Sequence, residues 1–118
     1  MPVDQGPEPA SLRLTSSFAG EVTVITVEGL LDATTRKQFA DYLSLAGLSV
    51  ILDLSGVTFM DSGALGLIIR HWQDSQAADE PFALIGVDSA RSKVMWITGL
   101  AKVLPLYEAL DEALVSLT

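Results

Sequence analysis

The stretch "VILDLSGVTFMDSGALGLIIRHW", Val50 to Trp72, joins two apolar segments through the polar cluster Met60-Asp61-Ser62-Gly63. Its first part, with the residue before it (49–54), is apolar on both faces, as a buried central strand is. Its last part carries apolar residues at the spacing of one helix face: Leu65, Ile68, Ile69 and Trp72. A strand, a polar loop and a helix in this order predict an α/β fold in which the cluster lies at the carboxyl end of the strand.

Two strands and a helix are predicted before this stretch. Residues 12–18 and 22–28 alternate between apolar and polar side chains around a short turn that contains Gly20, which predicts a β-hairpin. Asp32 then lies near the predicted cap of a helix that ends at Gly47. Its apolar face consists of Phe39, Leu43 and either Leu45 or Ala46.

After Trp72, the pattern alternates again between strand and helix. Residues 82–87 form a buried strand, and Asp88 or Ser89 caps a helix that ends at Gly99. The apolar face of that helix consists of Val94, Met95 and Ile97. Residues 103–107 suit an edge strand because Pro105 interrupts them, and 111–115 form a last helix.

The predicted fold is therefore a single α/β domain. We expect a mixed sheet of four to five strands, with an N-terminal hairpin and later parallel strands, flanked by about four helices. Residues 1–11 hold three of the five prolines and are predicted to be a flexible tail, so the domain covers 12–118. In such sheets, sites form where strand carboxyl ends meet helix amino ends. Asp32 and Ser62 both occupy that kind of position, so we expect them to lie close together.

Composition narrows the functional class. The chain has 118 residues, 49% of them hydrophobic, which is the size of one compact domain. Its formal charge of -8 disfavours nucleic acid and anionic membranes but is compatible with a basic protein partner. It has no cysteine, no apolar run long enough to cross a bilayer and no secretory signal pattern, so we expect a cytoplasmic protein.

Catalytic, metal and cofactor sites are not predicted. The frame around Ser62 lacks the Gly-x-Ser-x-Gly pattern of a hydrolase, and His71, the only histidine, lies about 13 Å further along the helix at 1.5 Å per residue. His71 is therefore expected to have a structural role. Asp32, Asp53 and Asp61 lack the spacing of a metal-binding loop, and no glycine-rich nucleotide-binding motif occurs.

The polar cluster leaves two interpretations open. Ser62 can cap the following helix by accepting a hydrogen bond from a backbone N–H, with Asp61 adding a favourable negative charge at the positive end of the helix dipole. Ser62 can also carry a phosphate, because a helix amino end offers unpaired N–H donors. Such a phosphate would add about -1.5 to -2 of charge to the surface without unfolding the domain.

Three segments resemble the STAS domain family. "DLSGVTFMDSGALGLI" resembles the family signature, and "EGLLDATTRKQF" resembles the strand that ends in Gly-x-Leu-Asp-x-x-Thr before the first helix. In this chain those positions are Gly29, Leu31, Asp32 and Thr35. "SARSKVMWITGLAKVLPLYEALDEAL" resembles the C-terminal pattern of the family, so the resemblance covers residues 12–117.

Within this family, the chain is most similar to bacterial anti-sigma factor antagonists. The resemblance implies binding to an anti-sigma factor that is also a serine kinase, release of a sigma factor, and inactivation by serine phosphorylation that a phosphatase reverses. It implies a phosphoprotein in transcription regulation and not an enzyme. The implied partner-binding residues are Asp32, Met60, Asp61, Ser62, Gly63 and Ala64.

At one position the chain departs from the antagonist pattern. The usual Asp-Ser-Ser-Gly or Asp-Ser-Thr-Gly carries the phosphate on its second hydroxyl residue, and Gly63 occupies that position here. Ser62 remains as the candidate phosphoacceptor. The departure also resembles the Asp-Thr-Gly-Gly-Leu of STAS subunits from lipid-transport ABC systems, so a non-switching STAS subunit or scaffold is the alternative function.

Overall fold

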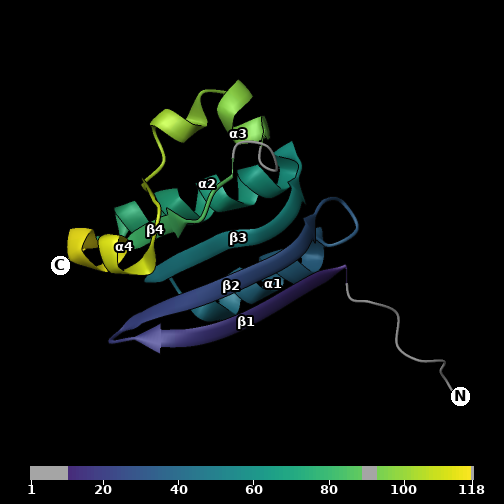
Figure 1. Ribbon diagram of the computed structural model, residues 1–118. Coiled ribbons are helices and arrows are strands. Elements are labelled where there is room, and N and C mark those ends of the chain that lie inside the picture. The colour runs from purple at the N-terminus through teal and green to yellow at the C-terminus, as the bar shows by residue number, and fades with distance from the viewer. Residues whose placement is uncertain (1–10, 89–92, 118) are drawn as a thin grey trace, which may run out of the picture.

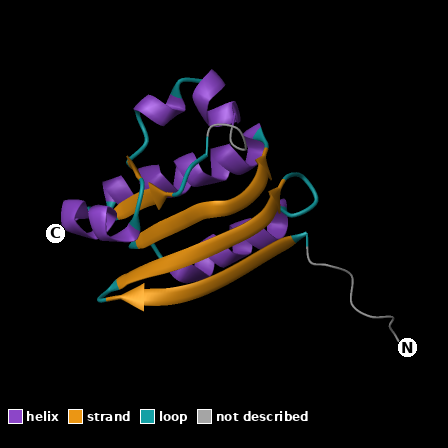
Figure 2. Cartoon of the chain, in the orientation of Figure 1, coloured by secondary structure: helices purple, strands orange, loops and turns teal. Residues whose placement is uncertain are grey.

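The computed structural model describes residues 11–88 and 93–117, which form one sheet with helices packed on both of its faces (Figures 1 and 2). The elements in chain order are β1 (Leu12–Ala19), β2 (Val22–Leu31), α1 (Arg36–Ala46), β3 (Val50–Met60), α2 (Ser62–Ala77), β4 (Phe82–Ile85), α3 (Lys93–Ile97), the 3₁₀ helix η1 (Leu100–Lys102), β5 (Leu106–Tyr107) and α4 (Leu110–Leu117). The predicted tail, apart from Ser11, lies outside the described residues.

The five strands follow one another across the sheet in chain order. β1 pairs with β2 in antiparallel fashion as the predicted hairpin, and β2, β3, β4 and β5 are parallel neighbours. β5 has only two residues and lies at the edge, as Pro105 predicted. The predicted fold class, a single α/β domain with a mixed sheet, an N-terminal hairpin and four helices, is confirmed.

Strand alternation produces one apolar core on each face of the sheet. Val24 and Ile25 are neighbours in β2 and point to opposite faces, so they belong to different cores. The larger core joins the sheet to α1, α2 and α3, with Phe39 of α1 and Ile68 of α2 both fully buried. The smaller core lies under α4, where Ala113 packs with Val24 and its neighbours in β3 and β4. Three helices therefore cover one face and α4 covers part of the other.

β3 differs from the prediction, because it continues to Met60 where a loop was expected after Leu54. Within β3, Asp53 accepts hydrogen bonds from the backbone N–H (3.0 Å) and the hydroxyl of Ser55. Two irregularities in the pairing of β2 with β3 each leave one extra residue in β3. These bulges let the second half of β3 pair with the end of β2, which a simple alternation pattern does not reveal.

One further prediction about apolar faces needs correction, and one open choice is decided. Ile97 was expected to be buried, but it is 81% exposed, and of its helix only Met95 is fully buried. In α1, where the prediction left Leu45 or Ala46 open, the partly buried Ala46 packs against the core and Leu45 is 89% exposed. The predicted start of the third helix, with Ser89 as one of its two candidate caps, falls on residues 89–92, which lie outside the described residues.

None of the helices within the described ranges combines the length and the apolar character that crossing a bilayer requires.

Candidate protein-binding corner

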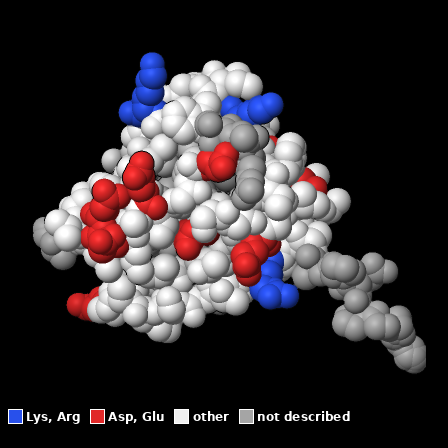
Figure 3. All heavy atoms as spheres, viewed as in Figure 1, with Lys and Arg blue, Asp and Glu red and all other residues white. Residues whose placement is uncertain are grey.

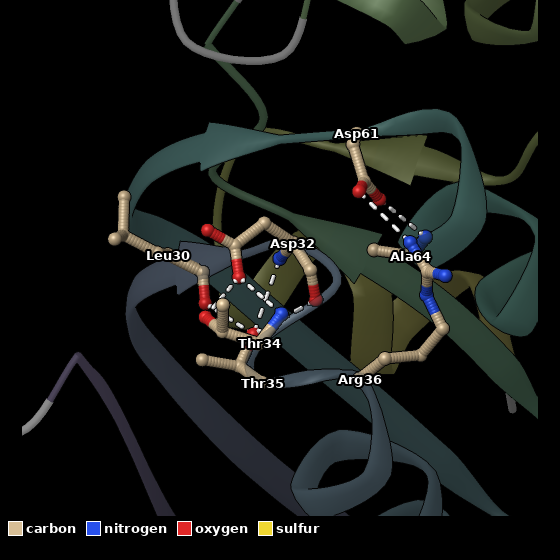
Figure 4. A network of polar contacts seen from close by, with 7 residues as sticks. All are labelled: Leu30, Asp32, Thr34, Thr35, Arg36, Asp61 and Ala64. Carbon is tan, nitrogen blue, oxygen red and sulfur yellow. Dashed lines mark hydrogen bonds and ion pairs between the residues drawn. The ribbon is translucent and has the colours of Figure 1, made fainter.

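The carboxyl ends of β2 and β3 bring two polar segments together. Leu31 pairs with Met60, and the backbone N–H of Asp61 donates to the carbonyl oxygen of Leu31 at 2.9 Å. Asp32 and Asp61 therefore follow directly on neighbouring parallel strands, with Ser62 next in the chain. The predicted proximity of Asp32 and Ser62 follows from this pairing. We call Asp32, Asp61, Ser62 and Gly63 the corner; Figure 4 shows its two aspartates.

Asp32 shapes the turn between β2 and α1. Its carboxylate accepts hydrogen bonds from the backbone N–H (2.9 Å) and the hydroxyl of Thr34, as Figure 4 shows. The hydroxyl of the buried Thr35 donates to the carbonyl oxygen of Leu30 at 2.8 Å and accepts from the backbone N–H of Asp32. α1 begins only at Arg36, so Asp32 is not its cap: it stabilises the preceding turn, a common alternative use of a short acidic side chain.

The Thr34 hydroxyl lowers the pKa of Asp32 below the ordinary value of an aspartate, and the backbone N–H groups of Thr34 and Thr35 act in the same direction. Because the ionised form is favoured in the folded chain, this turn is stabilised at neutral pH. That contribution disappears as the pH falls through the folded pKa, below about pH 4.

We expect an NMR titration of the Asp32 carboxyl to reach its midpoint at a lower pH than an ordinary aspartate. The Thr34→Val variant should raise that midpoint, because it removes the hydroxyl donor that favours the carboxylate. Equal Asp32 midpoints in wild type and Thr34→Val would show that the hydroxyl is not the cause.

Asp61, and not Ser62, caps α2. Its backbone is extended, with φ -95° and ψ 174°, and its carboxylate accepts from the backbone N–H of Ala64 at 2.8 Å. The second carboxylate oxygen accepts from a terminal guanidinium nitrogen of Arg36 at 2.8 Å. The prediction of Ser62 as the cap was therefore wrong by one residue. The carboxylate of Asp61 reaches the backbone N–H three positions further on and takes that role. Ser62 is the first residue of the helix and is exposed to solvent.

Two of the predicted partner-binding residues do not present their side chains at the surface. Met60 is 2% exposed and Ala64 is 1% exposed, and both belong to the larger core. Met60 is the last residue of β3 and Ala64 lies on the inward face of α2, so both side chains point toward the sheet and helices. They support the corner from beneath, and a partner would meet Asp32, Asp61, Ser62 and Gly63.

Sequence reasoning missed an apolar groove beside the corner. The groove has a volume of about 350 Å³, and its lining residues come from the end of β3, the start of α2 and α3: Thr58, Phe59, Met60, Asp61, Ser62, Lys93, Val94 and Ile97. Phe59 is 49% exposed and Ile97 is 81% exposed. Exposed aromatic and aliphatic side chains beside polar ones are typical of a protein-binding surface. The exposure of Phe59 depends on the unpredicted extension of β3.

Arg36 was missed as well. It extends from the first turn of α1 to Asp61 at the start of α2 and so links the two helices at the corner (Figure 4). The signal available in the sequence was Gly63, because a glycine within the first turn of a helix often marks a close approach by another group.

His71 has the structural role expected of it. Its Nε2 lies 2.6 Å from the carbonyl oxygen of Gly47, and its ring centroid lies 5.9 Å from that of Phe82. Among the described residues, no three histidine, aspartate or glutamate side chains are grouped as a metal site would require. On the face drawn in Figure 3, acidic side chains are spread widely and basic ones lie toward the edges, in keeping with the formal charge of -8.

Comparison with known proteins agrees with this architecture. The model of the STAS domain family matches residues 14–113, and the chain therefore belongs to the STAS domain family. A Thermotoga neapolitana protein, assigned by homology as an anti-sigma factor antagonist, is 29% identical over 76 residues, which are 64% of this chain and 67% of the relative.

Solved structures of anti-sigma factor antagonists share the fold. One from Mycobacterium paratuberculosis superposes with a TM-score of 0.80 at 24% identity, over 93% of this chain and 97% of the other. An anti-sigma factor antagonist (STAS) domain protein from Planctomyces limnophilus gives a TM-score of 0.72 at 28% identity, over 92% and 98% of the two chains.

Proposed function

We propose that this chain is an anti-sigma factor antagonist. In this account it binds an anti-sigma factor of the serine kinase type through the corner and the adjoining groove, and so releases a sigma factor in the cytoplasm. The observation that carries the proposal is the pairing of Leu31 with Met60, which presents Asp32 and Ser62 on one surface. The relatives named as anti-sigma factor antagonists give this surface its proposed partner.

The chemistry of the surface suits binding more than catalysis. Phe59 and Ile97 offer apolar area that a partner side chain can cover, and Asp61 and Ser62 add polar groups to the same groove. His71 cannot act as a general base for the Ser62 hydroxyl, because it lies in the second half of α2 and contacts the carbonyl oxygen of Gly47. We therefore propose a binding protein that is a kinase substrate and not itself an enzyme.

Ser62 is the proposed phosphoacceptor. Its side chain is exposed at the first position of α2, where a kinase can reach the hydroxyl. A phosphate there would be favoured by the helix dipole and would place about two negative charges on the binding surface. The phosphate would prevent binding, because its charge would have to be removed from water in the complex. A phosphatase would restore binding.

We expect incubation with the cognate kinase and ATP to add one phosphate to the chain, measured by intact-mass spectrometry. Ser62→Ala should abolish the gain, because it removes the only side-chain hydroxyl in the corner. Ser44→Ala, which alters an exposed serine near the end of α1, should leave it unchanged. A phosphate that persists in Ser62→Ala would exclude Ser62 as the acceptor.

One observation favours the alternative function, a non-switching STAS subunit or scaffold associated with a lipid-transport ABC system. Gly63 stands where the resembling antagonists carry the acceptor hydroxyl, and Arg36 lies against that glycine. Neighbouring open reading frames separate the two: a kinase-like ATPase or a sigma factor favours the antagonist, and permease and lipid-binding subunits favour the scaffold. A chain that binds its anti-sigma factor but never gains a phosphate would be a non-switching antagonist.

A further inference from the structure

Arg36 occupies the space above Gly63. A Cβ atom built at position 63 would lie 2.2 Å from a terminal guanidinium nitrogen of Arg36, 2.3 Å from its Cζ and 2.7 Å from its Nε. No side-chain carbon tolerates such distances. Gly63 does not have a positive φ, so its backbone alone would accept any residue. The glycine is therefore required by the arginine and not by the helix.

The position of Arg36 depends on that empty space. The guanidinium makes one ion pair, to Asp61, and its side chain is 41% exposed. Its Nε is buried and has no hydrogen-bond partner among the described residues. A buried donor without a partner is unfavourable. The ion pair with Asp61 offsets that cost, and the absence of a side chain at position 63 leaves room for the guanidinium.

We propose that Arg36 is a positioning residue at the start of α2, and that its ion pair with Asp61 depends on the absence of a side chain at position 63. While Arg36 contacts Asp61, its guanidinium fills the space that a side chain at position 63 would need. A side chain at position 63 displaces the guanidinium, which is the flexible end of a long side chain, and leaves Asp61 without its cation. Arg36 and Gly63 thus act as a coupled pair that sets the charge pattern of the surface.

This inference deepens the proposed function, since the surface in question is the proposed binding surface. It keeps Asp61 paired with a cation on that surface. The coupling itself needs no partner, so its test stands apart from the identity of the anti-sigma factor. If the chain bound no anti-sigma factor, the proposed function would be wrong, but the coupling between Arg36 and Gly63 would not be affected.

The test is a double-mutant cycle on the full chain, read by thermal unfolding. Gly63→Ala is made in wild type and in Arg36→Ala, and Gly66→Ala, which adds a Cβ with nothing within 4 Å, is the matched control on the same helix. Alanine is the better helix former, so Gly66→Ala should raise the midpoint by about 3 °C in both backgrounds. Gly63→Ala should raise it clearly more in Arg36→Ala than in wild type.

A spectroscopic readout separates positioning from a general effect on stability. In wild type, the NMR signal of the Arg36 Nε–H should exchange slowly with solvent because that atom is buried. Gly63→Ala should make its exchange fast, whereas Gly66→Ala should leave it slow. Equal midpoint shifts for Gly63→Ala in the two backgrounds, or an Arg36 Nε–H signal that Gly63→Ala does not change, would overturn the proposal.

Discussion

The Gly29→Ala variant is expected to have a free energy of unfolding about 2–4 kcal/mol lower than that of the wild type. Gly29 has a φ of 111°, which side chains rarely adopt, and a Cβ there would lie 2.2 Å from the carbonyl oxygen of Ser11. That oxygen accepts a hydrogen bond from the backbone N–H of Leu30 at 2.7 Å, so the alanine would force the start of β1 away and break this bond. Because Gly29 precedes the last pairs of β2 with β3, the damage extends toward the corner.

Gly20→Ala is the matched control for this prediction. Gly20 also has a positive φ, 63°, but a Cβ there meets nothing within 4 Å. The free energy of unfolding of this variant should therefore fall by only about 1 kcal/mol, the cost of the left-handed conformation for alanine. Urea unfolding of both variants measures the difference. Equal losses would mean that the contact with Ser11 is relieved at no cost and that the close approach of β1 to Gly29 has no structural importance.

The Ser62→Asp variant is expected to bind the anti-sigma factor at least tenfold more weakly than the wild type, which corresponds to a loss of about 1.4 kcal/mol of binding free energy. The added charge would enter the proposed binding surface, which already contains Asp32, and uncompensated charge in an interface is costly. The fold should be preserved, because an acidic residue in the first turn of a helix is favourable. Binding is measured by calorimetric titration of folded Ser62→Asp against the anti-sigma factor.

Ser44→Asp adds the same charge to an exposed position near the end of α1 and is the matched control. Its affinity should remain within a factor of about two of wild type, because a distant exposed charge is screened by salt. If Ser62→Asp binds as tightly as wild type, added charge at Ser62 is not an off signal. If both variants lose affinity equally, the effect comes from net charge and not from the corner.

The fold was predictable because the hydrophobic pattern is strong in most elements. Ile25 and Val27 in 22–28, and the helical spacing of Phe39 with Leu43, each match a face that packs in the larger core. The second half of β3 was missed because Ser55 and Gly56 interrupt the apolar run, and the bulges that accommodate the extra residues form only through pairing with β2. Long-range pairing of this kind leaves no periodic signal.

The corner was predicted in part, for a topological reason. Carboxyl ends of neighbouring parallel strands meet at one edge, so the proximity of the segments after β2 and β3 follows from strand order. Arg36 was not predicted, because a long side chain can reach many neighbours and only the coordinates show that it reaches Asp61. Met60 and Ala64 were assigned to the surface by motif, yet their side chains complete the core.

The central claim, that this chain releases a sigma factor by binding its anti-sigma factor, is tested most directly by displacement. A fluorescently labelled sigma factor is bound to the cognate kinase-type anti-sigma factor, and the unphosphorylated wild-type chain is added while anisotropy is followed. We predict that anisotropy falls to the value of free sigma factor as the chain forms its own complex with the anti-sigma factor. Unchanged anisotropy, together with no detectable complex between the folded chain and the anti-sigma factor, would contradict the account.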